Sequence, residues 1–227
     1  MRKYLAEFIG TFFLVLTVCI TVTKAIPLAP LAIGGVLMVM VYAGGHISGG
    51  HFNPAVTLAA LVRGVISVVD AVAYWAAQLL AGLLAALVAR YVVQRPTAPA
   101  LSLSGRALGV ALVVEALFTF ALAYVVLNVA TSKDNADNSF YGLAFGGTVM
   151  VGAVAVGGIS GGVFNPAVAL GGSVQGLLAW SSIWVYLVAN LVGGAVAGFA
   201  FLALNADDRP QAKPADAVTS APAPARP

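Results

Sequence analysis

Apolar residues occur along this chain in six long runs, which short polar or glycine-rich stretches separate. Each run is long enough to form a spanning helix, because about 20 apolar residues cross the hydrocarbon core of a bilayer. The runs cover residues 4–24, 28–45, 68–92, 107–128, 141–157 and 178–204. We therefore predict six transmembrane helices and an all-α membrane protein.

Two further apolar segments, 54–63 and 166–175, are too short to cross a membrane. Ten residues make a helix of about 15 Å, which is half of the hydrocarbon thickness. The first segment follows "GGHFN" and the second follows "GGVFN", and both begin with proline. Asparagine is a favoured N-cap and proline is favoured at the first helical position. Asn53 and Asn165 are therefore predicted to start two re-entrant half-helices.

The two halves of the chain repeat one another. The stretches "GGHISGGHFNPAV" and "VGGISGGVFNPAV" match at ten of 13 positions. Glu7 in "AEFIGTFFLVL" corresponds to Glu115 in "VEALFTFALAY", so that the repeats cover about 4–92 and 107–204. Each repeat holds three spans, and three is an odd number, so the second repeat enters the membrane from the opposite side. Such inverted repeats place their functional site at the midplane between the halves.

Inversion brings the N-termini of the two half-helices together near the bilayer centre. There, two positive helix ends and the amides of Asn53 and Asn165 would face a pore. The glycine-rich approaches to this point hold Gly49, Gly50, His51, Gly161 and Gly162. We expect their carbonyls to line one wall of the pore, and contact of the His51 side chain with the pore is one interpretation. This arrangement favours neutral hydrogen-bonding molecules over cations and protons.

Composition excludes most other classes of protein. The chain is 61% hydrophobic and 8% charged, whereas soluble domains carry about 25% charged residues. Its net charge of +3 comes from scattered residues, so nucleic acid is not an expected partner. The sequence offers no nucleophile–base pair and no metal-ligand cluster, so we expect no enzyme activity, no cofactor and no metal. A single cysteine, Cys19, excludes an intramolecular disulfide.

The two ends of the chain differ in character. The N-terminal apolar run continues to Val22 without a small-residue cleavage site, which indicates a first spanning helix rather than a signal peptide. Residues 205–227 are rich in proline and alanine and contain no aromatic residue. That composition predicts a disordered C-terminal tail.

The motifs resemble those of the aquaporin (major intrinsic protein) family. "AEFIGTFFLVL", "GHISGGHFNPAVTLA", "YWAAQLLAG" and "SGGVFNPAV" occur in the family's order and spacing, and the resemblance covers about residues 4–204. It implies an aquaporin-like channel domain over 1–204, with six helices and two re-entrant half-helices. It also implies a multi-pass protein of the cell membrane, a homotetramer with one pore per subunit, and two cytoplasmic termini.

The resemblance assigns supporting roles to three ionisable residues. Glu7 and Glu115 lie inside predicted spans, where acids are costly. By analogy with the matching glutamates of the family, each would accept hydrogen bonds from backbone N–H groups of the adjacent re-entrant loop, with direct handling of solute or protons as the alternative. His46 is similar to a family histidine beside the first loop. We expect it to be a hydrogen-bonded structural residue, with pore lining or pH gating as alternatives.

The resemblance also places a four-residue selectivity filter at Ile33, Ala153, Gly162 and Val168. The family usually has an arginine at the position of Val168, directly after the second Asn-Pro-Ala. Here no member of the set is charged or aromatic, and two are very small. A wider, apolar constriction is therefore predicted. It would admit glycerol-sized solutes or neutral metalloid hydroxides as well as water.

We therefore predict a passive channel for water and small uncharged solutes. Two other interpretations remain. Inverted repeats and broken helices also build secondary transporters, although no cluster of acids and cation ligands occurs near the predicted midplane. A structural membrane protein with a vestigial pore would have the same hydropathy pattern.

Overall fold

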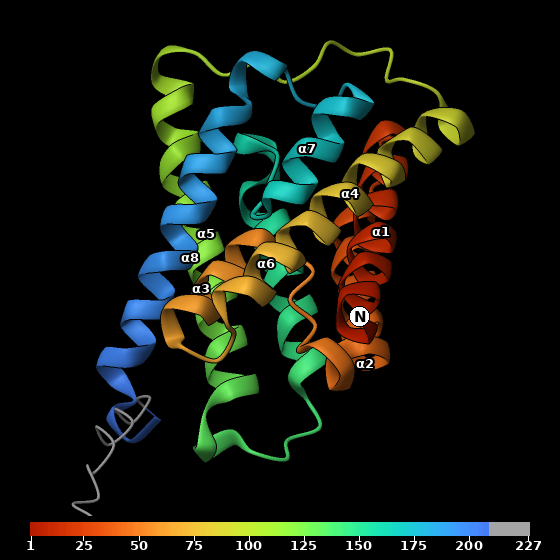
Figure 1. The fold of residues 1–227 in the computed structure, drawn as a ribbon. Helices are drawn as coiled ribbons and strands as arrows, with labels where there is room; N and C mark the ends of the chain where they lie inside the picture. Colours follow the sequence, from red (N-terminus) through yellow and green to blue (C-terminus); the bar gives the residue numbers. More distant parts are fainter. Residues whose placement is uncertain (209–227) are drawn as a thin grey trace, which may run out of the picture.

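The computed structural model describes residues 1–208, and most of the tail predicted to be disordered lies outside them. Six long helices form the body of the molecule (Figure 1): α1 (Arg2–Thr23), α2 (Ala29–Ser48), α4 (Val68–Val93), α5 (Gly105–Thr131), α6 (Tyr141–Ser160) and α8 (Ile183–Leu204). The described part also contains two short helices, α3 (Pro54–Arg63) and α7 (Pro166–Gln175). It further contains three 3₁₀ turns: η1 (Lys133–Asn135), η2 (Trp180–Ser182) and η3 (Ala206–Asp208). The predicted tail is folded as far as Asp208, which accepts a hydrogen bond from the Lys133 backbone N–H.

The six predicted spans are confirmed within the described residues. All six long helices have the length and apolar composition needed to cross a bilayer, with mean hydropathies of 1.6 to 2.4. Helices α2 and α6 run three residues further than predicted, to Ser48 and Ser160. They stop at Gly49 and Gly161, which have φ angles of 89° and 97°. Glycine adopts this left-handed conformation without a steric penalty, so the chain can leave the helix there.

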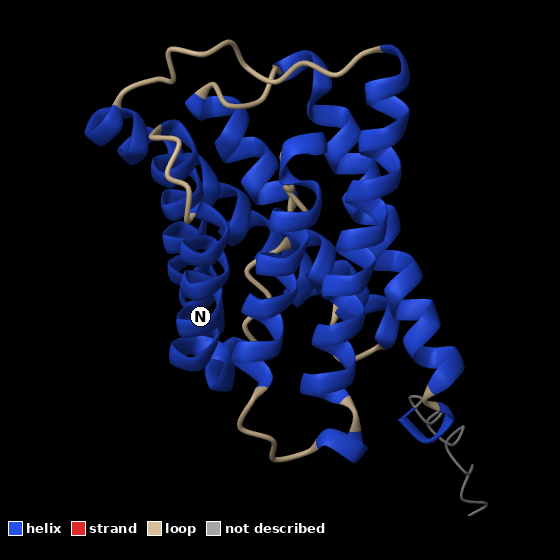
Figure 2. Cartoon of the chain, turned by 180° about the vertical axis from the view of Figure 1, so that it is seen from behind, coloured by secondary structure: helices blue, strands red, loops and turns tan. Residues whose placement is uncertain are grey.

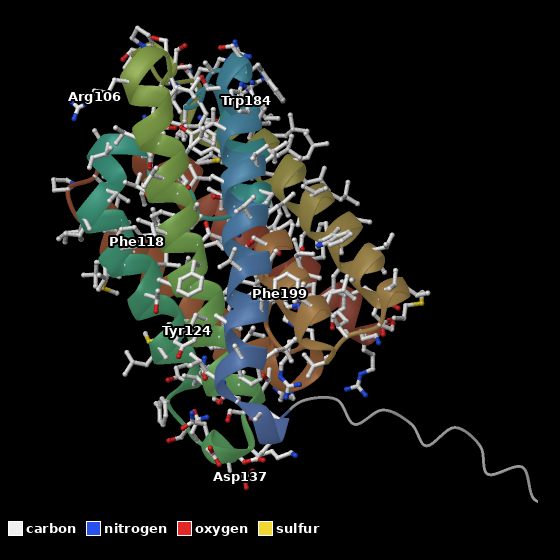
Figure 3. All side chains as sticks on the ribbon, turned by 90° about the vertical axis from the view of Figure 1, so that its left-hand side faces the viewer. Arg106, Phe118, Tyr124, Asp137, Trp184 and Phe199 are labelled. Atoms are coloured by element: carbon white, nitrogen blue, oxygen red, sulfur yellow. The ribbon has the colours of Figure 1, made fainter. Side chains whose placement is uncertain are left out.

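The outer surface is apolar over the middle of the molecule. Figure 3 shows Phe199 on the outer face of α8, with Arg106 and Asp137 at opposite ends of the molecule. Phe199 is 64% exposed, and large exposed apolar side chains occur on every long helix. A surface of this kind has lipid rather than water as its solvent.

The half-helices enter from opposite ends. In Figure 1, α3 lies in the lower half of the molecule and α7 in the upper half. Figure 2 shows the loops before them, in tan, running into the middle of the helices. Both half-helices end at glycines with positive φ, Gly64 and Gly176. The predicted pair of re-entrant half-helices in an inverted repeat is therefore present.

Glycines let each half-helix pack closely against the last long helix of the other repeat. A side chain at Gly82 of α4 would place its Cβ 2.7 Å from the Ala167 carbonyl oxygen of α7. At Gly194 of α8, a Cβ would overlap the Ala55 carbonyl oxygen of α3. Small residues at such crossings allow backbones to approach, which stabilises helix pairs in lipid. Close packing of α7 on α4 and of α3 on α8 therefore joins the two repeats.

Replacing Gly194 with valine should destabilise the protein by about 1–3 kcal/mol, because the new side chain must push α3 away. Thermal unfolding of the purified protein in detergent measures this as a lower Tm. Gly147→Val is the matched control, since a Cβ at Gly147 of α6 has no atom within 4 Å. Equal Tm values for the two variants would contradict the close packing of α3 on α8.

Candidate channel

The two asparagines tie the half-helices together at the centre of the molecule. Asn53 Nδ2 donates to the Phe164 carbonyl at 2.8 Å, and Asn165 Nδ2 donates to the Phe52 carbonyl at 2.9 Å. Each Asn Oδ1 also accepts from the backbone N–H of the second residue of its own half-helix, Ala55 or Ala167, at 2.8 and 2.9 Å. An amide nitrogen carries two N–H groups. One N–H of each asparagine therefore remains for a molecule in the adjoining cavity.

Phe52 and Phe164, whose carbonyls accept these two hydrogen bonds, have an unusual backbone conformation. Their φ angles are +46° and +49°, in the left-handed region that bulky residues seldom adopt. Each ring occupies space that a glycine leaves free. A Cβ at Gly10 would overlap the Phe52 ring, and one at Gly152 would lie 2.7 Å from the Phe164 ring. The sequence alone does not single out either glycine, because the ring that each one accommodates is distant along the chain: 42 residues from Gly10 and 12 residues from Gly152.

Glu7 holds the first approach by accepting four hydrogen bonds. Its Oε1 accepts from Ser48 Oγ at 2.7 Å and from the His51 N–H at 2.9 Å. Its Oε2 accepts from the Phe52 N–H at 2.7 Å and from Gln78 Nε2 at 2.8 Å. The side chain is fully buried. The carboxylate thus supplies acceptors that a broken backbone inside a membrane otherwise lacks.

Glu115 holds the second approach by accepting three hydrogen bonds, one fewer than Glu7. It accepts from Ser160 Oγ at 2.7 Å and from the N–H groups of Val163 and Phe164 at 2.9 and 2.8 Å. Asn190 occupies the repeat position equivalent to Gln78, but its side chain is one methylene shorter. It accepts instead from Thr119 Oγ1 at 3.0 Å.

The structure places His46 differently from its predicted supporting role. Its side chain is exposed on α2, and no side-chain hydrogen bond joins it to the first loop in the described part. Ser48 makes the loop contact instead, because it lies on the face of α2 that meets Glu7. The sequence interpretation also missed Tyr74 and Tyr186, whose hydroxyls donate to the carbonyls of Ser48 and Ser160 at 2.8 and 2.7 Å. Their equal spacing from the two asparagines was the available signal.

One cavity of about 450 Å³ brings most of the predicted pore residues together. Both asparagines line it, as do all four predicted filter residues and three residues of the approaches: Asn53, Asn165, Ile33, Ala153, Gly162, Val168, Gly50, His51 and Gly161. Gly49 instead lines a second cavity of about 290 Å³ near the lower end of the molecule. His51 and Val126 line both cavities, so the two adjoin there.

The wall of the larger cavity is mostly apolar. Apolar side chains from α1, α2, α5 and α6 face the re-entrant loops across it, and within the described part no lysine or arginine lines it. The Arg90 guanidinium does not take the place of the missing filter arginine. It donates to the Val174 carbonyl near the upper end of α7, outside the cavity lining. At the predicted filter, only backbone groups can therefore form hydrogen bonds with a solute.

Two adjoining cavities, and two half-helix N-termini that meet beside the larger one, form the arrangement expected of a membrane channel. A family model described as major intrinsic protein matches residues 1–201. The chain belongs to the major intrinsic protein family. As a member, it is a multi-pass membrane channel for water and small solutes rather than an enzyme.

Relatives of this major intrinsic protein carry names of both water and glycerol channels. It is 40% identical over 222 residues to glycerol uptake facilitator protein-like 6 of Lactiplantibacillus plantarum, covering 92% of this chain and 100% of the relative. It is 37% identical to aquaporin NIP1-4 of Oryza sativa subsp. japonica, covering 88% and 76%. The solved aquaglyceroporin from Plasmodium falciparum has the same fold, with a TM-score of 0.70 over 88% of this chain and 94% of that chain at 21% identity.

Proposed function

We propose that this channel conducts glycerol-sized uncharged solutes and neutral metalloid hydroxides together with water. The apolar set of Ile33, Ala153, Gly162 and Val168 supports this most directly, since all four residues line the same cavity. A filter set without an aromatic side chain or a guanidinium leaves room for a carbon skeleton. Its backbone groups can bind hydroxyls one at a time, which suits a neutral polyol. The relative named a glycerol uptake facilitator-like protein agrees with this solute class.

Exclusion of cations and protons then depends on the centre of the pore. Because the filter has no fixed positive charge, the paired N-termini of α3 and α7 supply the main electrostatic barrier. The free N–H groups of Asn53 and Asn165 would donate to each passing oxygen and interrupt a hydrogen-bonded chain of water. The reciprocal hydrogen bonds between the loops hold both donors in place.

The proposal extends to the assembly and placement of the chain. We infer an aquaporin-like channel domain over 1–204, made of repeats 4–92 and 107–204, in a homotetramer with one pore per subunit. It would lie in the cell membrane with both termini in the cytoplasm. The broad apolar surface that each long helix exposes supports contact with lipid and with other subunits.

Purified protein in liposomes tests the function. Stopped-flow light scattering should show water, glycerol and a neutral metalloid hydroxide entering faster than in protein-free liposomes, without saturation and without dependence on a pH gradient. A Val168→Trp variant should lower all three rates, because its ring would fill the constriction. Rates equal to those of protein-free liposomes would indicate a vestigial pore, and coupling to protons would indicate a secondary transporter.

A further inference from the structure

The connection between α4 and α5 is attached to the upper mouth of the channel by its backbone. Residues 99–103 of this connection, called the strap here, pass beside the segment that follows α7 (Figure 1). The Leu101 N–H donates to the Leu177 carbonyl at 2.9 Å, and the Ala179 N–H donates to the Leu101 carbonyl at 2.9 Å. The Leu103 N–H donates to Ser182 Oγ at 2.9 Å. Three hydrogen bonds to one segment hold the strap in one position.

This attachment brings the Leu101 side chain to the channel. Leu101 and Leu178 form the single parallel bridge of the described chain, and both line the larger cavity. A Cβ added at Gly161 would lie 3.6 Å from a methyl carbon of each leucine. The two leucines therefore meet over the second approach, one residue from the filter position Gly162. Leu178 is 6% exposed and Leu101 is 36% exposed, so Leu101 is the more open of the pair.

We propose that Leu101 is a specificity-determining residue, which forms with Leu178 an apolar collar above the four-residue filter. A solute that passes two leucine side chains must give up water there without gaining a hydrogen bond, which costs more for each hydroxyl it carries. A solute with a bare hydrocarbon face loses less. The collar therefore favours small uncharged diols with an apolar face over triols of the same length. This inference rests on the proposed function, because it concerns solutes moving through the same pore.

Propane-1,2-diol and glycerol test the collar, since they differ by one hydroxyl. Both permeabilities are measured in liposomes, with the protein-free rate subtracted. Leu101→Asn keeps the size of the side chain and adds a donor and an acceptor. We expect the diol-to-glycerol ratio to fall about two- to tenfold, the range that one net hydrogen bond supplies. Leu101→Met keeps an apolar side chain and should preserve the ratio.

Ser102→Asn is the matched control, because it adds the same amide to an exposed strap residue that does not line the cavity. It should leave the ratio unchanged. A fall of equal size in Ser102→Asn, or none in Leu101→Asn, would overturn the collar while the proposed function stands. If the wild-type protein passes neither solute, the proposed function itself fails.

Thiol labelling locates the Leu101 side chain without relying on selectivity. The native Cys19 is fully buried, so wild-type protein should be insensitive to a bulky, membrane-impermeant thiol reagent. The reagent should block glycerol flux through Leu101→Cys but leave flux through Ser102→Cys largely intact. Labelling of Leu101→Cys without a block would place the side chain away from the solute path and refute the proposal.

Discussion

Replacing Glu7 with glutamine is expected to destabilise the protein and to reduce its water permeability strongly. The amide would turn one of the two acceptor oxygens into a donor. If the nitrogen faces Ser48, the serine hydroxyl can rotate to accept, but the His51 N–H loses its partner. If it faces Gln78, that side chain can flip, but the Phe52 N–H loses its partner. Either way, one buried backbone donor is left unpaired at a cost of about 1–3 kcal/mol.

Thermal unfolding in detergent and stopped-flow water flux measure the two effects of this change. Asp70→Asn makes the same chemical replacement at a carboxylate that pairs with Lys3 at 2.8 Å near the surface. Partly exposed pairs contribute about 0–1 kcal/mol, so this control should unfold close to the wild type. If the Tm of Glu7→Gln is no lower than that of Asp70→Asn, then Glu7 does not hold the first approach through its four hydrogen bonds.

Val168→Arg is expected to lower glycerol permeability far more than water permeability. A guanidinium would narrow the cavity and bring five N–H donors and a permanent positive charge to the filter. The glycine-rich approach lines the same cavity, and we expect its carbonyl oxygens to accept from the guanidinium. We expect the glycerol-to-water ratio to fall by at least about tenfold, which corresponds to about 1.4 kcal/mol of added barrier. Any proton leak should fall as well, because a fixed charge is restored.

Val168→Met separates bulk from charge in this experiment. It lengthens the side chain without charge, so glycerol flux should fall while any proton leak stays at the wild-type level. Liposomes loaded with a pH-sensitive dye report the leak, and light scattering reports both solutes. Equal losses of water and glycerol in Val168→Arg, or a gain in glycerol selectivity, would show that Val168 does not lie at the constriction.

Hydropathy and motif chemistry alone determined the architecture of this protein. Six apolar runs of spanning length leave no other class of fold, because a backbone in lipid must satisfy its hydrogen bonds internally. Asn-Pro at the start of two short runs predicts helix N-termini for a local reason, capping, which needs no tertiary contact. The structure has both caps, at Asn53 and Asn165. An odd number of spans in each repeat then implies inversion.

Tertiary packing decided which side chains support the pore. Glu7 was predicted to hold the first loop, but Ser48 rather than His46 assists it, because the face of α2 that meets α1 depends on how the two helices rotate. Hydropathy cannot resolve that rotation in a helix that is apolar on most sides. Gly10 and Gly194 likewise read as ordinary helix glycines until Phe52 and Ala55 are placed against them.

The position of the strap is the feature that the sequence predicts least. Leu101 lies in a polar connection, and nothing in the residues around it predicts that its side chain reaches the channel. Its position comes from backbone hydrogen bonds to Leu177 and Ala179, more than 70 residues further along the chain. Every residue except proline carries a backbone N–H, and all carry the carbonyl, so such a pairing leaves no signature in the amino-acid types. Only the folded arrangement of α4, α5 and α7 brings these groups together.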